Sequence, residues 1–71
     1  MTQYAVVFER GKRNWSAYVP DLPGCIATGK TRKETEQMIR EAIEFHLEGM
    51  RLHGHSIPPL ISTAANVRVS A

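Results

Sequence analysis

The sequence predicts an α+β fold in which an antiparallel sheet carries one long helix packed on one face. Three observations support this class. Short runs of aromatic and β-branched residues are separated by turn signals. One long stretch has the 3.6-residue periodicity of an amphipathic helix. The links between the first three runs are too short for crossover connections, so a meander is expected. The predicted order is β-β-β-α-β, in a single domain over residues 1–71.

The strands are predicted from composition and from the turns that separate them. Residues 4–9 and 15–19 are rich in aromatic and β-branched side chains, and the polar loop at 10–14 has hairpin length. Residues 25–28 form a short third strand. Residues 66–70, with two valines on one face, predict the final strand.

A proline turn separates the second and third strands. Leu22-Pro23-Gly24-Cys25 is typical of a type II turn, because proline presets φ at its second position and glycine supplies a positive φ at its third. Asp21 is expected to close an Asx-type turn just before it. The segment therefore predicts a rigid link rather than a catalytic loop.

The helix is predicted over residues 31–53. Thr31 and Glu34 have the spacing of a capping box, and Gly54 is expected to act as the C-terminal cap. The apolar arc of this helix covers roughly 220°, whereas about 100° is enough to cover one sheet. The excess needs another cover, either the C-terminal segment or a second chain. It is centred on Ile43, Leu47 and Met50.

Size and cysteine content favour self-association in the cytoplasm. A chain of 71 residues has a marginal core, and such chains usually add disulfides, a metal or oligomerisation. The lone cysteine, Cys25, excludes an intrachain disulfide and is expected to be a small buried residue. We therefore expect a homo-oligomer, either a dimer or a tetramer. No signal peptide and no apolar run of membrane-spanning length is present, so a cytoplasmic protein is expected.

The sequence offers little for catalysis, so an enzyme is not expected. His46 lies within the apolar arc and is expected to pack, with no nucleophile to activate. Asp21 could hold Mg²⁺ together with Glu9, but nuclease chemistry normally needs several converging carboxylates. No catalytic residue, metal site or cofactor is predicted.

Two groups of side chains are candidates for binding a partner. Aromatic residues anchor interfaces, and the surplus apolar residues of the helix need a cover. The candidates for a partner or oligomer interface are Trp15, Tyr18, Asp21, Ile43, Leu47 and Met50. Basic side chains in two loops form the alternative, a nucleic-acid contact. They are Arg10, Lys12, Arg13, Lys30, Arg32 and Lys33.

Residues 15–25, followed by 28–31, resemble a known family. The aromatic strand, the P-D-L-P-G-C block and the G-x-T that opens the helix are similar to the N-terminal domain of HicB-like antitoxins. The exit from the helix, a glycine followed by an Ile-Pro pair, also fits that family. The resemblance implies a truncated ribonuclease-H-like sheet without the acidic cluster of that enzyme.

The same resemblance implies a function. It implies an inhibitor of a HicA-like mRNA interferase, a toxin similar to a double-stranded-RNA-binding domain, whose catalytic histidine the antitoxin masks. Many members carry a C-terminal DNA-binding module, but Pro59 leaves only 12 of the 71 residues after it. A separate module and direct DNA binding are therefore not expected, and the chain is identified as a solitary form.

The leading hypothesis from the sequence is an antitoxin-like protein that binds and neutralises a HicA-type toxin by masking its active site. Three alternatives stay open. One is a small nucleic-acid-binding domain that uses the basic loops. The second is an oligomeric interaction module without a toxin. The third is a nuclease that uses Glu9 and Asp21 with Mg²⁺.

Overall fold

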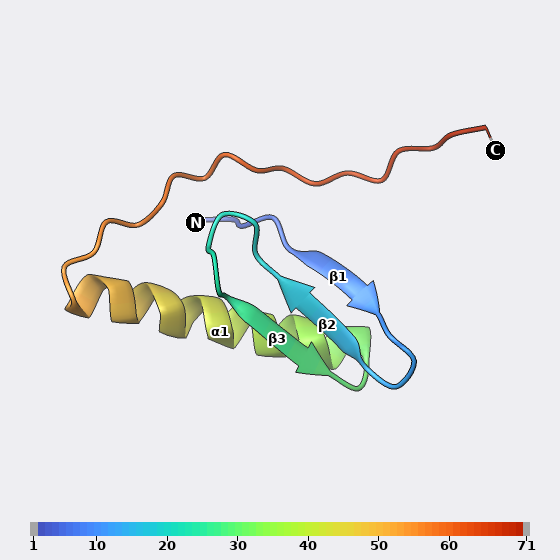
Figure 1. Cartoon of the computed structure of the whole chain (residues 1–71), viewed down its shortest axis with the longest axis horizontal. Coiled ribbons are helices and arrows are strands. Elements are labelled where there is room, and N and C mark those ends of the chain that lie inside the picture. Colours follow the sequence, from blue (N-terminus) through green and yellow to red (C-terminus); the bar gives the residue numbers. More distant parts are fainter. Residues whose placement is uncertain (1, 71) are drawn as a thin grey trace.

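The computed structural model describes residues 2–70, which form a three-stranded sheet and one helix (Figure 1). The sheet is antiparallel and its spatial order, β1-β2-β3, follows the order along the chain. The helix α1 lies behind the sheet in Figure 1 and covers one of its faces. The elements are β1 (Val7–Arg10), β2 (Trp15–Tyr18), β3 (Ile26–Gly29) and α1 (Arg32–Leu52). The predicted α+β class, with three strands and then a long helix, is confirmed.

The register divides the strands into an inner and an outer face. Ala17 of β2 lies opposite Phe8 and Ala27, and this row faces α1. The neighbouring row faces away from the helix, and its β2 and β3 members, Tyr18 and Ile26, are exposed. Successive side chains of a strand point to opposite faces, so Ala17 is buried whereas Tyr18 next to it is exposed. Among residues 2–70, the helix therefore covers one face of the sheet.

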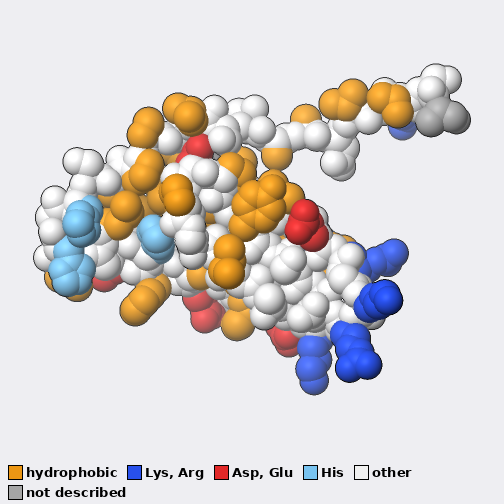
Figure 2. All heavy atoms as spheres, in the orientation of Figure 1, with side chains coloured by type: hydrophobic (Ala, Val, Ile, Leu, Met, Phe, Trp, Pro, Cys, Tyr) orange, Lys and Arg blue, Asp and Glu red, His pale blue; other side chains and the backbone are white. Residues whose placement is uncertain are grey.

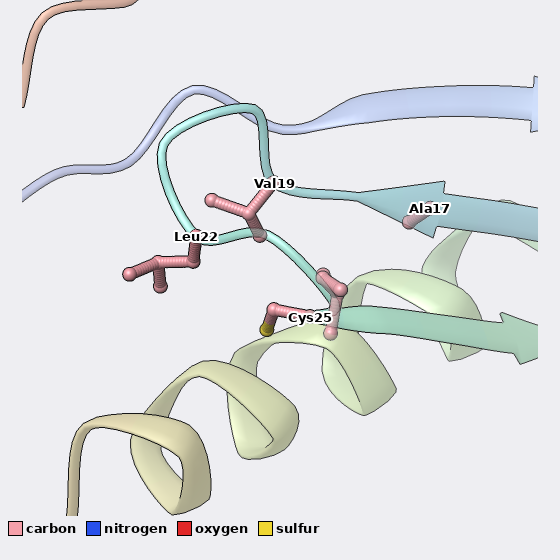
Figure 3. Packing of buried hydrophobic residues seen from close by; sticks show 5 residues of the cluster. Ala17, Val19, Leu22 and Cys25 are labelled. Atoms are coloured by element: carbon pink, nitrogen blue, oxygen red, sulfur yellow. The ribbon is translucent and has the colours of Figure 1, made fainter. Parts of the chain in front are cut away.

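The core lies between the proline turn and α1 (Figure 3). Its buried members come from β2, from the turn that follows it and from one position of α1. They are Ala17, Val19, Leu22, Cys25 and Ile39. Leu22 is fully buried, so the turn is part of the core rather than a surface loop.

The backbone of the proline turn closes its hydrogen bonds within itself. The amide of Cys25 donates to the carbonyl of Leu22 at 3.0 Å, and Gly24 has φ +84°. This geometry confirms the predicted type II turn, in which the third position needs a positive φ. Two further backbone bonds involve Val19. Its carbonyl accepts from the amide of Leu22 at 3.0 Å, and its amide donates to the carbonyl of Cys25 at 3.2 Å.

Both helix ends are capped. At the N-terminus, the Thr31 hydroxyl accepts from the amide of Glu34 at 3.0 Å. The Glu34 carboxylate accepts from the amide of Lys30 at 2.8 Å, one residue earlier than in the usual capping box. At the C-terminus, the amide of His55 donates to the carbonyl of Met50 at 2.9 Å, around a glycine with positive φ. This is a Schellman ending, and the predicted cap at Gly54 is confirmed.

The last strand predicted from the sequence is absent. Residues 55–70 form neither helix nor strand, and the segment runs back past β1 as extended chain (Figure 1). Val67 and Val69 are 80% and 72% exposed, so they bury little apolar area. A strand forms where pairing and burial offset the entropy of ordering, and these valines gain too little burial for that.

Candidate protein-binding surfaces

The position of α1 leaves part of the inner sheet face uncovered. The helix packs mainly on β3 and β2, so a groove remains between α1 and the chain that leads into β1. Its volume is about 680 Å³, which is room for several side chains of another molecule. We call it the β1–α1 groove.

The β1–α1 groove has an apolar floor and a charged rim. The floor is formed by Tyr4, Val6, Phe8, Ile39, Ile43 and Leu47. The rim is formed by exposed side chains of α1, namely Arg32, Glu36, Arg40 and Glu44. This combination of apolar centre and polar border is the usual anatomy of a protein interface.

Interactions within the rim fix its charges in place. The guanidinium carbon of Arg32 lies 4.3 Å from the centre of the Phe8 ring, in cation–π geometry. Glu36 pairs with Arg32 at 3.1 Å and with Arg40 at 3.7 Å. These pairs are exposed and add little stability, and with Glu44 they give the rim charges of both signs.

The structure brings together only some of the predicted interface residues. Ile43 and Leu47 lie in the groove, where they are joined by Phe8 of β1 and by half-buried residues of the chain that leads into it. Tyr18 lies on the opposite, outer face of the sheet. Trp15 begins β2 and lines a neighbouring hollow together with Phe8 and Arg32, outside the groove itself. Met50 is half-buried and does not line the groove. The six candidates therefore do not form one patch.

The interface residues predicted from the sequence did not include the part of the groove that is formed by β1 and the chain leading into it. Its members alternate along the chain as Tyr4, Val6 and Phe8, and this alternation predicts one apolar face. Both faces of that strand looked apolar, so its position at the edge of the sheet could not be read from the pattern. The edge position is what exposes the groove.

Asp21 holds the C-terminal segment. Its carboxylate accepts from the amides of Ile61 and Ser62 at 3.1 and 3.0 Å, and from the Ser62 hydroxyl at 2.7 Å. These bonds, led by that of the hydroxyl, lower the pKa of Asp21 and outweigh the opposing effect of burial. The side chain is 7% exposed and binds a segment 40 residues away, instead of closing the expected Asx-type turn.

Residues with catalytic potential lie apart. Glu9 is opposite Ser16 near the β1–β2 loop, whereas Asp21 lies beyond the other end of β2. The Cys25 thiol is buried, and burial raises its pKa, which disfavours the reactive thiolate. Among residues 2–70, no cluster of three or more His, Cys, Asp or Glu side chains could hold a metal ion. Within the described residues, no helix combines the length and the apolar character that crossing a membrane requires.

Basic side chains gather at one end of the molecule (Figure 2). The register joins the β1–β2 loop to the end of β3, because Trp15 is paired with both Arg10 and Gly29. The basic residues of the two loops therefore share one end. They are Arg10, Lys12, Arg13, Lys30, Arg32 and Lys33.

Sequence comparison identifies the family. The family model described as "HicB_like antitoxin of bacterial toxin-antitoxin system" matches residues 4–69. The chain belongs to the HicB-like antitoxin family. The resemblance noted in the sequence is thereby confirmed over nearly the whole chain.

Individual relatives agree with this assignment. A UPF0150 protein of Thermoplasma acidophilum is 37% identical over 57 residues, covering 79% of this chain and 83% of that protein. An uncharacterized 14.9 kDa protein of Haemophilus phage HP1 is 36% identical over 55 residues, which cover 78% of this chain. This chain spans only 41% of the length of that phage protein.

A solved structure has the same fold. A chain of the HicA3 and HicB3 toxin-antitoxin complex superposes with a TM-score of 0.72 and is 25% identical. The match covers 83% of this chain and 70% of that one. The HicB-like fold therefore occurs in a complex that contains a toxin.

Proposed function

We propose that this HicB-like protein is an antitoxin that binds a HicA-type mRNA interferase and neutralises it by masking the active site. The observation that carries the proposal is the family match over residues 4–69. The similarity to a chain of a toxin-antitoxin complex supports it further. Inhibition of this kind is steric and needs no turnover, and it fits the scattered positions of Glu9, Asp21 and Cys25.

The β1–α1 groove is the surface that we assign to the toxin. Its floor offers desolvated apolar contacts, which supply most of the binding energy at protein interfaces. Its rim carries charges of both signs, and rim charges of this kind orient a partner during association. Ile43 and Leu47, proposed from the sequence as uncovered helix residues, lie at its centre. A homo-oligomeric state forms part of the same proposal, because the core of so short a chain is small.

Co-expression with a HicA-type toxin tests the proposal. The wild-type protein should restore growth and co-purify with the toxin. Arg40→Glu on the exposed rim and Val6→Asp on the floor should weaken both by at least about tenfold, the effect of losing 1.4 kcal/mol. Ile26→Glu on the outer sheet face is the control and should bind normally, because Ile26 lies outside the groove. Absence of co-purification and of growth rescue by the wild-type protein would refute the function.

Nucleic-acid binding is a second candidate, favoured by the convergence of basic residues at one end (Figure 2). A phosphate contact of this kind weakens steeply as salt increases, because bound counterions are released. Binding to RNA should therefore fall by a large factor between 50 and 200 mM salt, and Arg13→Ala should flatten this dependence. Binding that is absent at the lower salt concentration excludes this candidate.

A further inference from the structure

A second hollow lies beside the β1–α1 groove, and Trp15 is one of its walls. Its volume is about 600 Å³, within the size range of sites that bind small organic groups. It is lined by Trp15, Phe8 and Arg32 and by residues 64–66 of the C-terminal segment. We call it the Trp15 hollow.

The indole of Trp15 lies at the open end of the inner sheet face. Trp15 precedes Ala17 by two residues, so both side chains point to the face that α1 covers. Ala17 is buried, whereas Trp15 is only half-buried. Its cross-strand neighbours are Arg10 on one side and Gly29, which has no side chain to cover the ring, on the other. Part of the indole is therefore accessible from the hollow.

The C-terminal wall of the hollow is held in place by Asp21. The bonds from Asp21 to Ser62 lie two residues before Ala64, where the wall begins. Asn66 ends the wall, and its side-chain amide can both donate to and accept from the edge of a base. The Trp15 hollow therefore combines an aromatic surface for stacking with a group for hydrogen bonding.

Positive charge surrounds this hollow (Figure 2). Residues 9–15 and 29–36 contain six of the nine basic side chains and three of the seven acidic ones. These two stretches therefore carry a net charge of +3, and the rest of the chain carries −1. Within residues 2–70, ion pairs engage one of these six basic side chains, that of Arg32, which pairs with Glu36. The other five are available to bind phosphates.

A stacking surface within a basic region matches a nucleic acid whose bases are unpaired. Single strands bind through Lys and Arg contacts to the backbone and through stacking of bases on aromatic rings. A duplex keeps its bases stacked inside and offers none to Trp15. Unpaired bases are typical of RNA loops and ends, which proteins recognise by stacking on aromatic side chains. An acidic peptide would match the charge but would leave the aromatic hollow without a role.

We propose that single-stranded RNA binds at this end of the molecule, with one unpaired base on Trp15 and the phosphates on the basic side chains around it. The inference rests on nucleic-acid binding, the second candidate function, and names its substrate class. It is independent of toxin binding, because the β1–α1 groove does not include Trp15.

Fluorescence of the wild-type protein tests the site directly, because Trp15 is the only tryptophan in the sequence. At about 50 mM salt, where phosphate contacts are strong, a short single-stranded oligouridylate should bind and quench the emission of Trp15. An abasic oligonucleotide of the same length carries the phosphates without the bases, and it should bind at least about tenfold more weakly. An RNA duplex should leave the emission unchanged. Equal affinity for the first two, or binding of the oligouridylate without quenching, overturns the proposal. Tighter binding to single-stranded DNA of the same sequence overturns the assignment to RNA.

Substitutions separate stacking from charge. In binding assays with labelled oligonucleotides, Trp15→Ala should remove the preference for the oligouridylate over the abasic strand, and Trp15→Phe should keep most of it. Arg13→Ala should weaken both strands by the same factor. Arg51→Ala is its matched control, about 28 Å from Arg32 along the helix axis, and should change neither. A Trp15→Ala variant that keeps the wild-type circular dichroism and still prefers the oligouridylate overturns the proposal. If Trp15→Ala does not fold, the wild-type measurements decide.

The outcomes distinguish this inference from the candidate function on which it rests. Absence of binding to every nucleic acid at the lower salt concentration excludes both. Equal binding of the oligouridylate and the abasic strand, with the emission of Trp15 unchanged, removes the base site and leaves a phosphate contact at the basic end. The antitoxin function is tested separately by co-purification with the toxin and stands in either case.

Discussion

The proline turn, residues 19–25, and the C-terminal segment, residues 55–70, are both irregular and both contain two prolines, yet they are held very differently. The turn closes three backbone hydrogen bonds within itself and buries Leu22 completely. The C-terminal segment is mostly exposed and is tied to the rest of the chain by the carboxylate of Asp21. Proline content alone therefore does not order a segment.

What separates the two regions is local closure and burial. Buried backbone groups need partners, and the turn supplies them from within seven residues of sequence. Beyond the helix cap at His55, the C-terminal segment has two amides, those of Ile61 and Ser62, that bond to a side chain about 40 residues away. The comparison predicts that changes in the turn affect the whole fold, whereas changes in the segment stay local.

The largest effect is expected for Leu22→Ala. Removing a fully buried leucine side chain leaves a cavity, and such changes lower the free energy of unfolding by about 3 kcal/mol. Urea denaturation followed by circular dichroism measures this loss. Leu60→Ala in the C-terminal segment is the control and should cost less than about 1 kcal/mol, because Leu60 is half exposed. Equal losses for the two variants would remove the distinction between the regions.

A smaller effect is expected for Gly24→Ala. Gly24 has φ +84°, a conformation that costs a residue with a Cβ about 1–2 kcal/mol. No heavy atom lies within 4 Å of the added Cβ, so the loss measures backbone strain alone. The same urea experiment applies, with Ser56→Ala in the C-terminal segment as a near-neutral control. A Gly24→Ala variant as stable as the wild type would show that the turn tolerates another geometry.

Acid should release the C-terminal segment before the rest of the fold responds. The pKa of Asp21 is lowered in the folded chain, so its contribution is present above the ordinary carboxyl pKa and is lost as the pH falls through the lowered value. The amide signals of Ile61 and Ser62 in ¹H–¹⁵N spectra should shift over that range. Asp21→Asn should abolish the titration.

Ser62→Ala sharpens the same test. The Ser62 hydroxyl makes the largest contribution to the lowered pKa, so its removal should move the release of the segment to higher pH. An unchanged midpoint in Ser62→Ala would show that the backbone amides alone hold the carboxylate.

The smallest effect is expected at the end of the segment. Val67→Asp and Val69→Asp should change the free energy of unfolding by less than about 0.5 kcal/mol, because both side chains are largely exposed. A larger loss in either variant would mean that this stretch packs on the fold in solution. Differential scanning calorimetry at several protein concentrations measures it.

Sequence reasoning succeeded where structure depends on neighbours along the chain. The type II turn at Pro23, the cap at Thr31 and the helix end at Gly54 each need only a few adjacent residues. The strand predicted at 66–70 was wrong because pairing depends on a distant edge and on burial, and neither is encoded locally. The bond from Asp21 to Ser62 was equally invisible, since no pattern connects residues 41 positions apart.

The binding surfaces were predictable only in part. The excess apolar arc of the helix was recognised, and two of its central residues, Ile43 and Leu47, do line the groove. The arc could not be divided into the residues that line the groove and those that stay exposed, because that division depends on where α1 lies across the sheet. The position of α1 also imposes a requirement at the end of β3 that could not be predicted from the sequence. A Cβ at Gly29 would lie 2.6 Å from the Thr35 hydroxyl oxygen, so the end of β3 must be glycine.

The sheet order β1-β2-β3 follows the chain, and the helix comes next. Each strand consequently pairs with the one synthesised just before it, and no long loop must close before a pairing can form. Topologies of this kind have low contact order and fold quickly, on the order of milliseconds for mixed α/β domains. Each strand can thus pair without a long loop closure, but the inner face of the sheet is buried only when α1, the last element, packs on it.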